Sequence, residues 1–198
     1  MALVWTGETL ECKQDTSADE PVSLPAVELT LMTLAEQPMQ ATGDCTLRKA
    51  TNADIPAVWA LISSVLLSYG ITANQATTDT DLVDIEANYW DRKGAFFVLL
   101  DGETVIGTAA LHHESDAVCE VCRMYLAPAY RGRGLGRRLL EHCLREASER
   151  GFKEMCLKTA SVLVEAISLY KRAGFSVEEG AEVGGNCDLV MRRRLRER

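Results

Sequence analysis

The segment Arg131–Arg137, with the sequence RGRGLGR, constrains the fold of this chain most strongly. Its three glycines stand at alternate positions, where the lack of a side chain lets the backbone bend tightly and approach a ligand closely. The segment joins a strand-like run to an amphipathic helix, and the start of a helix offers unpaired N–H groups at the positive end of its dipole. The surrounding arginines add donors suited to phosphate. The segment therefore predicts a turn that binds a pyrophosphate.

Length and composition indicate one domain with a sizeable core. The chain has 198 residues, of which 47% are hydrophobic and 25% charged, as is ordinary for a soluble globular protein. No apolar run reaches the length of a membrane span, so we expect no membrane partner. The N-terminus lacks the pattern of a secretion signal, and the seven cysteines form an odd, irregularly spaced set. Reduced thiols and a cytoplasmic location are the simplest interpretation.

The net charge of −8 is concentrated at the N-terminus. Residues 1–44 carry eight acidic side chains and one lysine, whereas residues 45–198 are nearly neutral, which argues against a nucleic-acid partner. We therefore divide the chain into an acidic N-terminal extension, 1–44, and a domain, 45–198. The extension is either a tail or a packed accessory segment. It could cover the domain, mediate formation of a homodimer or have no further role.

The pattern of apolar and turn residues in the domain predicts an α/β fold with a mostly antiparallel central sheet flanked by helices. The expected strands are 47–48, 95–100, 104–112, 117–126, 155–159, 175–177 and 188–192. The expected helices are 51–70, 80–90, 135–150 and 162–173. Thr51 and Asp54 provide a start signal for the first helix, and the Asp101-Gly102 pair predicts the turn of a hairpin.

Three motifs in this order resemble the GNAT superfamily of acetyl-CoA-dependent N-acetyltransferases. They are the strand 119–128, the R-x-x-G-x-G pattern that begins at Arg131, and the helix 166–175 with the sequence AISLYKRAGF. The resemblance covers residues 46–193 and leaves the acidic extension outside. It implies a GNAT-like fold with acetyl-CoA as co-substrate and no metal.

The resemblance also implies which residues bind coenzyme A. The backbone N–H groups of the turn hold the pyrophosphate, and the end of the preceding strand contacts the pantetheine arm and the thioester carbonyl. In this chain these residues are Arg131, Gly132, Arg133, Gly134, Leu135, Gly136 and Arg137 for the pyrophosphate, and Met124, Tyr125 and Leu126 for the arm. A gap between this strand and 155–159 would admit the pantetheine like an added strand.

Two catalytic residues follow from the same resemblance. Glu120 is the candidate general base, acting directly or through water, because the attacking amine must first be neutral. Tyr170 is the candidate general acid for the departing thiolate, and the Leu126 N–H is the donor for the oxyanion. Glu120 as a paired strand residue and Tyr170 as a packing residue are the alternatives. Leu163 replaces an asparagine that many members use near the pantetheine.

The predicted activity is acetyl transfer to a primary amine of a small molecule or peptide. The alternative is a catalytically weak acyl-CoA sensor with the same fold. Cys119 and Cys122 lie three apart on one strand, so they point to opposite faces and are interpreted as buried packing rather than as a metal site. His112 and His113 likewise point to opposite faces. The arginines 192–194, with Arg196 and Arg198, are expected to form a solvated tail, and an electrostatic partner in the acidic extension is the alternative.

Overall fold

The computed structural model of this protein describes residues 45–76, 79–181, 183 and 187–195, so the predicted extension 1–44 lies outside the described residues. Seven strands form one sheet in the order β1-β2-β3-β4-β5-β7-β6. Their bounds are Thr46–Lys49 (β1), Ala95–Asp101 (β2), Thr104–His113 (β3), Val118–Leu126 (β4), Glu154–Thr159 (β5), Ser176–Val177 (β6) and Leu189–Arg194 (β7). Neighbouring strands run antiparallel except β4 and β5, which run parallel. The predicted mixed α/β fold with a mostly antiparallel sheet is confirmed.

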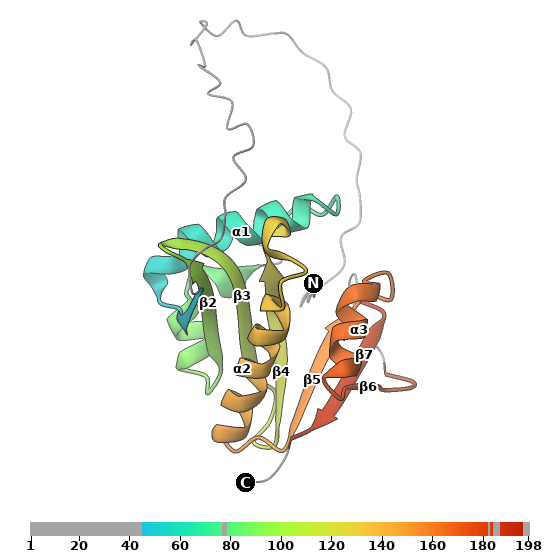
Figure 1. Ribbon diagram of the computed structural model, residues 1–198. Coiled ribbons are helices and arrows are strands. Elements are labelled where there is room, and N and C mark those ends of the chain that lie inside the picture. Colours follow the sequence, from blue (N-terminus) through green and yellow to red (C-terminus); the bar gives the residue numbers. More distant parts are fainter. Residues whose placement is uncertain (1–44, 77–78, 182, 184–186, 196–198) are drawn as a thin grey trace, which may run out of the picture.

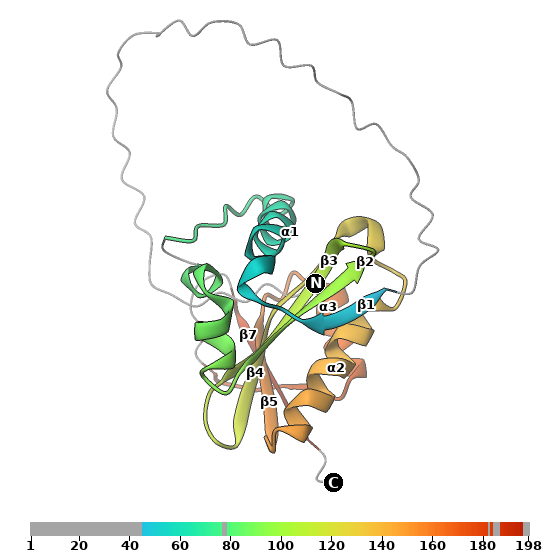
Figure 2. The same ribbon diagram turned by 90° about the vertical axis from the view of Figure 1, so that its left-hand side faces the viewer.

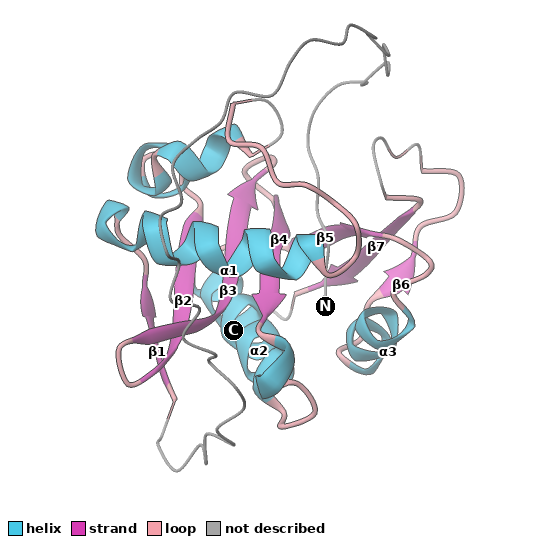
Figure 3. Ribbon diagram, turned by 90° about the horizontal axis from the view of Figure 1, so that it is seen from above, coloured by secondary structure: helices cyan, strands magenta, loops and turns pink. Residues whose placement is uncertain are grey.

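Helices cover both faces of this sheet (Figure 1). The α-helices are Ile55–Leu67 (α1), Leu135–Glu149 (α2) and Val164–Arg172 (α3). Helix α1 lies on one face together with the short helices η2 (Thr80–Val83) and η3 (Glu86–Trp90), and α2 and α3 lie on the other (Figures 2 and 3). Both α1 and α2 pack against β3 and β4, so the centre of the sheet is buried from both sides.

The core consists of apolar side chains from the central strands and from the helix faces that cover them. Strand β2 is buried along six successive residues, and α2 buries Leu139, Leu140, Cys143, Leu144 and Ala147. Among the described residues, no helix is long and apolar enough to cross a membrane.

The expected helix 80–90 is wrong in type, because the structure has a 3-10 helix, η2, and a π-helix, η3. Asp84 separates them in an extended conformation, with φ −151° and ψ 94°. Its carboxylate accepts hydrogen bonds from the Ala87 N–H (2.9 Å) and the Asn52 side chain (3.0 Å). A side chain that bonds to the backbone in this way competes with a continuous helix. The apolar spacing of this segment could not reveal the break.

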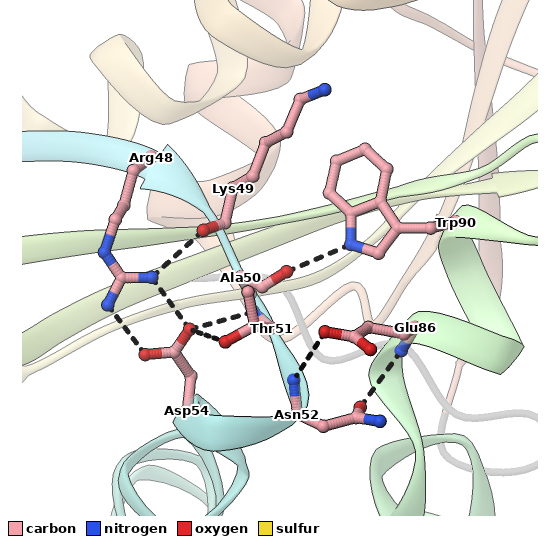
Figure 4. Close-up of polar contacts among 8 residues, drawn as sticks. All are labelled: Arg48, Lys49, Ala50, Thr51, Asn52, Asp54, Glu86 and Trp90. Atoms are coloured by element: carbon pink, nitrogen blue, oxygen red, sulfur yellow. Dashed lines mark hydrogen bonds and ion pairs between the residues drawn. The ribbon is translucent and has the colours of Figure 1, made fainter.

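The junction between β1 and α1 is held by polar contacts (Figure 4). Arg48 and Asp54 form two parallel hydrogen bonds of 2.7 Å, and the Asp54 carboxylate also accepts a bond from the Thr51 N–H (2.9 Å). Asn52 and Glu86 bond to each other's backbone N–H groups, which ties the junction to η3. The helix start predicted at Thr51–Asp54 is confirmed as a 3-10 turn, η1 (Asn52–Asp54), that leads into α1.

The three arginines expected in a solvated tail belong to β7, so that prediction is wrong. Arg192 is paired with Cys156 in the sheet register, and its guanidinium bonds to Glu154 and Glu178. The strand extends two residues beyond its predicted end because Arg193 and Arg194 continue the ladder with β5, opposite Met155 and Glu154. Residues 196–198 lie outside the described residues.

We expect Asp54→Asn to lower the free energy of unfolding by about 2 kcal/mol at neutral pH, because it weakens a charged double hydrogen bond and a helix cap. The hydrogen bond from Arg48, followed by bonds from Thr51, lowers the pKa of Asp54. A carboxylate with a lowered folded pKa contributes stability above its unfolded pKa and loses it as the pH falls through the folded value. The difference from wild type should therefore shrink below about pH 4.

Urea unfolding followed by circular dichroism at several pH values measures this effect. The exposed Asp91→Asn is the control and should change the unfolding free energy by less than about 0.5 kcal/mol. A loss from Asp54→Asn that persists undiminished in acid would contradict the assignment.

Candidate active site

An opening between β4 and β5 forms the centre of the candidate site. The two strands pair only through Val118–Glu120 and Glu154–Cys156, although β4 continues to Leu126 and β5 to Thr159. Beyond Glu120 and Cys156 the strands diverge, and α2 begins at the end where they are farthest apart (Figure 1). The predicted gap between these strands is therefore present.

Two residues at the end of β4 turn backbone groups toward this opening. The Ala127 N–H donates to the Ile106 carbonyl beside β3, at 2.8 Å. Because successive residues of a strand point their backbone groups to alternate sides, the N–H groups of Leu126 and Met124 face away from β3 and toward β5. Tyr125 lies two residues before Ala127, so its backbone groups face β3 as the Ala127 N–H does. All three side chains are buried.

A β-bulge in β4 lies directly before these residues. Thr108 is paired with Tyr125 and Ala110 with Cys122, so two residues of β4 stand opposite one residue of β3. Arg123 is the bulged residue and has a left-handed backbone, with φ 49°. The buried Thr108 hydroxyl donates to the Arg123 carbonyl at 2.7 Å and fixes the bulge. Such a bulge turns the following residues relative to the sheet.

The Arg123 side chain anchors a buried ion cluster that the sequence analysis missed. Its guanidinium bonds to Asp79 at 2.6 Å and to Asp81 at 2.9 and 2.5 Å. The Tyr89 hydroxyl donates a short hydrogen bond to Asp81. Burial raises the pKa of Tyr89 well above its ordinary value, so this phenol stays protonated. A charged residue within the apolar run V-C-R-M-Y was the signal that could have revealed buried partners.

The glycine turn has the backbone predicted for it. Gly132 and Gly134 have φ values of 75° and 79°, a conformation that costs other residues about 1–2 kcal/mol. Gly134 is the N-cap of α2, and no acidic side chain stands in the first turn of that helix. Within the described residues, the backbone N–H groups of 132–137 make no hydrogen bond, and the next one, of Arg138, bonds to the Gly134 carbonyl. The turn is therefore an unfilled set of donors at a helix N-terminus.

The arginines of the turn are held in different ways. Arg131 folds back over β4, donating to the Leu126 carbonyl (3.3 Å) and to the Tyr69 hydroxyl (3.2 Å). Arg133 stacks on the ring of Tyr130, with 5.3 Å between the guanidinium carbon and the ring centroid. Arg137 is exposed and paired with Glu141 at 2.7 Å. Their positive charge surrounds the free N–H groups.

Tyr170 lies on α3 with its side chain fully buried. Burial raises the pKa of its phenol far above the ordinary value, and the neighbouring thiols of Cys143 and Cys187 act in the same direction. Its ring packs edgewise on Phe175, 6.0 Å between centroids. No hydrogen bond to the hydroxyl is formed within the described part of the chain. Tyr170 therefore packs in the core, as the alternative interpretation expected. Its hydroxyl is protonated and has no hydrogen-bond partner among the described residues.

Glu120 lies at the vertex where β4 and β5 separate, as the last residue of β4 paired with β5. Its side chain is 2% exposed, and Oε2 accepts a 2.9 Å bond from Lys158. Oε1 is buried without a hydrogen-bond partner among the described residues. Burial raises the pKa of Glu120, Lys158 opposes this rise, and the charge of the neighbouring Glu114 carboxyl and its hydrogen bond with Glu120 add to it. Glu120 is therefore a strand residue paired with Lys158, and its second oxygen has no donor from the described residues other than the carboxyl of Glu114 when that is protonated.

A groove of about 990 Å³ runs between α2 and α3 on the side of the turn. Its polar lining is mostly cationic, with one carboxylate among the arginines, and its apolar lining comes from leucines of the two helices. The lining residues are Arg137, Leu140, Glu141, Leu144, Leu169, Arg172, Ala173, Gly174, Arg193 and Arg194. The groove extends the positive surface from the turn along α2.

The two cysteines of β4 and the two histidines at the end of β3 point to opposite faces of the sheet, as expected. Cys119 is close to Cys143 of α2, whereas Cys122 is close to Tyr89 of η3, so the two thiols face opposite sides of the sheet. His112 approaches Tyr89, with 6.5 Å between ring centroids, and His113 approaches Phe152 at 5.9 Å. Leu163, which replaces the expected asparagine, is buried at the start of α3.

The chain is similar to known acetyltransferases in sequence and in structure. It is 35% identical over 152 residues to the uncharacterized N-acetyltransferase YjgM of Escherichia coli, a match that covers 74% of this chain and 91% of YjgM. It is 36% identical over 98 residues to N-acetylaspartate synthetase of Rattus norvegicus, covering 48% of this chain and 33% of that protein. The structure of yncA from Salmonella typhimurium, solved with its cofactor acetyl-CoA, superposes with a TM-score of 0.62 at 26% identity. That superposition covers 79% of this chain and 96% of yncA.

The family model for acetyltransferases of the GNAT family matches residues 65–175, which contain β4, the glycine turn, α2 and α3. With more than half of the chain matched and a relative of similar length above 30% identity, the protein belongs to the GNAT family of acetyltransferases.

Proposed function

We propose that this protein transfers the acetyl group of acetyl-CoA to a primary amine of a small molecule or peptide. The observation that carries this proposal is the set of free N–H groups at 132–137, at the open end of the gap between β4 and β5. A pyrophosphate on this turn directs the pantetheine arm of the same molecule into the gap. Membership of the GNAT family supports acetyl-CoA as the donor.

The donor binds along three connected surfaces. The N–H groups from Arg131 to Arg137 hold the pyrophosphate at the N-terminus of α2. The pantetheine arm pairs with the outward-facing backbone groups of Met124 and Leu126, and the Tyr125 side chain packs beneath it. The cationic groove between α2 and α3 accepts the 3′-phosphate of the nucleotide, with Arg172 and Arg193 as donors.

The reaction is a direct attack of the neutral amine on the thioester carbon. The new C–N bond forms as the carbonyl oxygen becomes an oxyanion, and the Leu126 N–H, which faces the gap, stabilises that charge. The oxyanion then re-forms the carbonyl as the C–S bond breaks, and the nitrogen gives its extra proton to the water chain that ends at Glu120. The thiolate takes the proton of the Tyr170 hydroxyl, which solvent restores before the next turnover. The free hydroxyl of a buried, protonated phenol suits this transfer.

Glu120 serves as the general base through water. At about 3.3 Å per strand residue, the Cα atoms of Glu120 and Met124 lie roughly 13 Å apart, which is too far for direct contact with an amine at the thioester. Its free Oε1 can accept the proton at the end of a short water chain. The raised pKa brings this carboxyl closer to neutral pH, where a base accepts a proton more readily.

An acceptor screen tests the proposed function. Thiol release from acetyl-CoA is followed with a panel of amines, products are identified by mass spectrometry, and acetyl-CoA binding is measured by calorimetry. Transfer to at least one amine supports an enzyme. Binding of acetyl-CoA with no transfer to any amine would support the sensor instead.

Tyr170→Phe tests the general acid. We expect kcat to fall about a hundredfold, with the dissociation constant of acetyl-CoA unchanged, because the phenol acts only on the leaving thiolate. The raised pKa keeps Tyr170 protonated, so the loss should be the same from about pH 7 to pH 9.5. A variant with wild-type kcat throughout this range would remove Tyr170 from the mechanism.

Glu120→Gln and Lys158→Gln together test the base. We expect kcat/KM of the wild type to fall in acid as Glu120 becomes protonated, and Glu120→Gln to be slow at every pH. Lys158 opposes the rise in the pKa of Glu120, so its removal should raise that pKa and move the acid limb to higher pH. The pH dependence of kcat/KM measures both effects, and an acid limb that Lys158→Gln leaves in place would contradict the role of Glu120.

Arg172→Ala tests whether the groove between α2 and α3 binds the 3′-phosphate of coenzyme A. We expect KM for acetyl-CoA to rise about tenfold and KM for acetyl-dephospho-CoA, which lacks the 3′-phosphate, to stay unchanged. Arg145→Ala is the matched control, because Arg145 is an arginine of α2 that bonds to His142 outside the groove lining. Equal effects of Arg172→Ala on the two donors would place the 3′-phosphate elsewhere.

A further inference from the structure

The face of the sheet that carries α1 holds a set of paired charges along β4, β5 and β7, which extends from the paired part of β4 and β5 to the vertex of their opening at Glu120. Three cations extend from β4, β5 and β7 on this face: Arg123, Lys158 and Arg192. Contacts identify the face, because Arg123 bonds to Asp81 of η2, and η2 and η3 lie on the side of α1 (Figure 2). Cys122 contacts Tyr89 of η3, so Glu120, two residues earlier, and its partner Lys158 lie on this face as well.

Each of these cations stands between two carboxylates. Arg123 bonds to Asp79 and Asp81. Arg192 bonds to Glu154 at 2.7 Å and to Glu178 at 2.5 Å. Lys158 bonds to Glu120, and the charge of Glu114 also raises its pKa. The set therefore contains six carboxyl groups and three cations. The excess is three negative charges when all six are ionised and two when Glu120 and Glu114 share a proton in their hydrogen bond.

Two further observations support the view that this face attracts a positively charged group. Besides the carboxylates already counted, the described parts of the segments that connect α1 to η3 and β6 to β7 contain three acidic residues, Asp84, Glu179 and Asp188, and no lysine, arginine or histidine. The second observation is independent of any count. Glu120 is 2% exposed, lies at the vertex of the opening and has an oxygen without a hydrogen-bond partner in the described part of the chain, although an unsatisfied buried acceptor is costly.

The donor and the acceptor must approach the thioester from opposite faces. The glycine turn and the arginine groove, which would hold coenzyme A, belong to α2 and α3. An amine therefore reaches the thioester carbon from the face of α1, past the carboxylates. A free arginine or lysine would be needed there to bind an acceptor carboxylate, and all three cations of the set are already bonded to carboxylates.

We propose that the acceptor is an oligocation, a primary amine with at least one further positive charge on the same molecule, bound by the excess of carboxylates on the face of α1. This inference rests on the proposed acetyl transfer and adds the class of its acceptor. Di- and polyamines and lysine-containing peptides share this chemistry. Amino acids with acidic side chains do not.

Three amines of equal length provide the direct test: 1,4-diaminobutane, 1-aminobutane and 4-aminobutanoate, whose far ends are positive, neutral and negative. We expect kcat/KM to fall in that order by about tenfold at each step, and the spread to shrink as the salt concentration rises. Aspartate should react no faster than 4-aminobutanoate. A triamine and a lysine-containing tripeptide, measured beside them, separate a small polyamine from a peptide as the source of the charge.

A pair of charge variants ties the preference to this face. Glu114→Gln with Glu178→Gln removes two carboxylates while Arg192 keeps Glu154 and Lys158 keeps Glu120. We expect the ratio of kcat/KM for 1,4-diaminobutane over 1-aminobutane to fall at least about fivefold. Glu103→Gln, an exposed change in the β2–β3 turn, is the control and should leave the ratio unchanged.

The outcomes separate the two proposals. Equal rates for the three amines, or a preference for 4-aminobutanoate, overturn the oligocation inference and leave acetyl transfer standing. If acetyl-CoA binds and no amine reacts, the proposed transfer fails. In that case calorimetry of the same three amines with the coenzyme A complex still decides the inference, because tighter binding of the diamine supports it and equal binding overturns it.

Discussion

The interrupted pairing of β4 and β5 is the constraint on which the rest of the site depends. The two strands run parallel and bond only through their first three paired positions. Beyond that point the backbone groups on the facing edges of the two strands, among them the N–H groups of Met124 and Leu126, face a gap, and a buried polar group without a partner costs about 1–3 kcal/mol. The gap must therefore hold water or a ligand with its own donors and acceptors. The two amides of a pantetheine arm meet this requirement, and the glycine turn lies where its pyrophosphate would bind.

The ion cluster of Arg123 fixes the backbone of β4 at the edge of that gap. Arg123 is only 3% exposed and has a left-handed backbone, so its side chain leaves the strand toward Asp79 and Asp81. Removing one partner of a buried pair costs about 3–5 kcal/mol, because a charge is then left without compensation. The segment after α1 is thereby fixed to the residue directly before Met124. Arg123 thus connects the segment after α1, on the side proposed for the amine, with the end of β4, where coenzyme A is proposed to bind.

Much of this fold follows from the sequence, whereas the acceptor face does not. Alternating apolar residues define the strands, and glycine at 132 and 134 permits the left-handed backbone that the turn adopts there. Both are local properties of the chain. The pairs of Arg123 with Asp79 and Asp81 join residues more than 40 positions apart, and Arg192 meets Glu154 only because β5 and β7 are neighbours in the sheet. Separations of this kind carry no periodic signal, so the bulge, the break at Asp84 and the extension of β7 appear only in the folded chain.

The two faces of the sheet carry opposite charge beside one opening, and under the proposed function this arrangement would separate coenzyme A from the amine. On the side of α2 and α3, free N–H groups and arginines favour the phosphates of the donor. On the side of α1, each cation is flanked by two carboxylates, which repel those phosphates and attract an ammonium group. The same carboxylates stabilise the ammonium form and so oppose its deprotonation. The proposed role of Glu120 as the base fits this constraint, because a carboxyl whose pKa is raised by burial holds the proton of the amine better than a carboxyl of ordinary pKa.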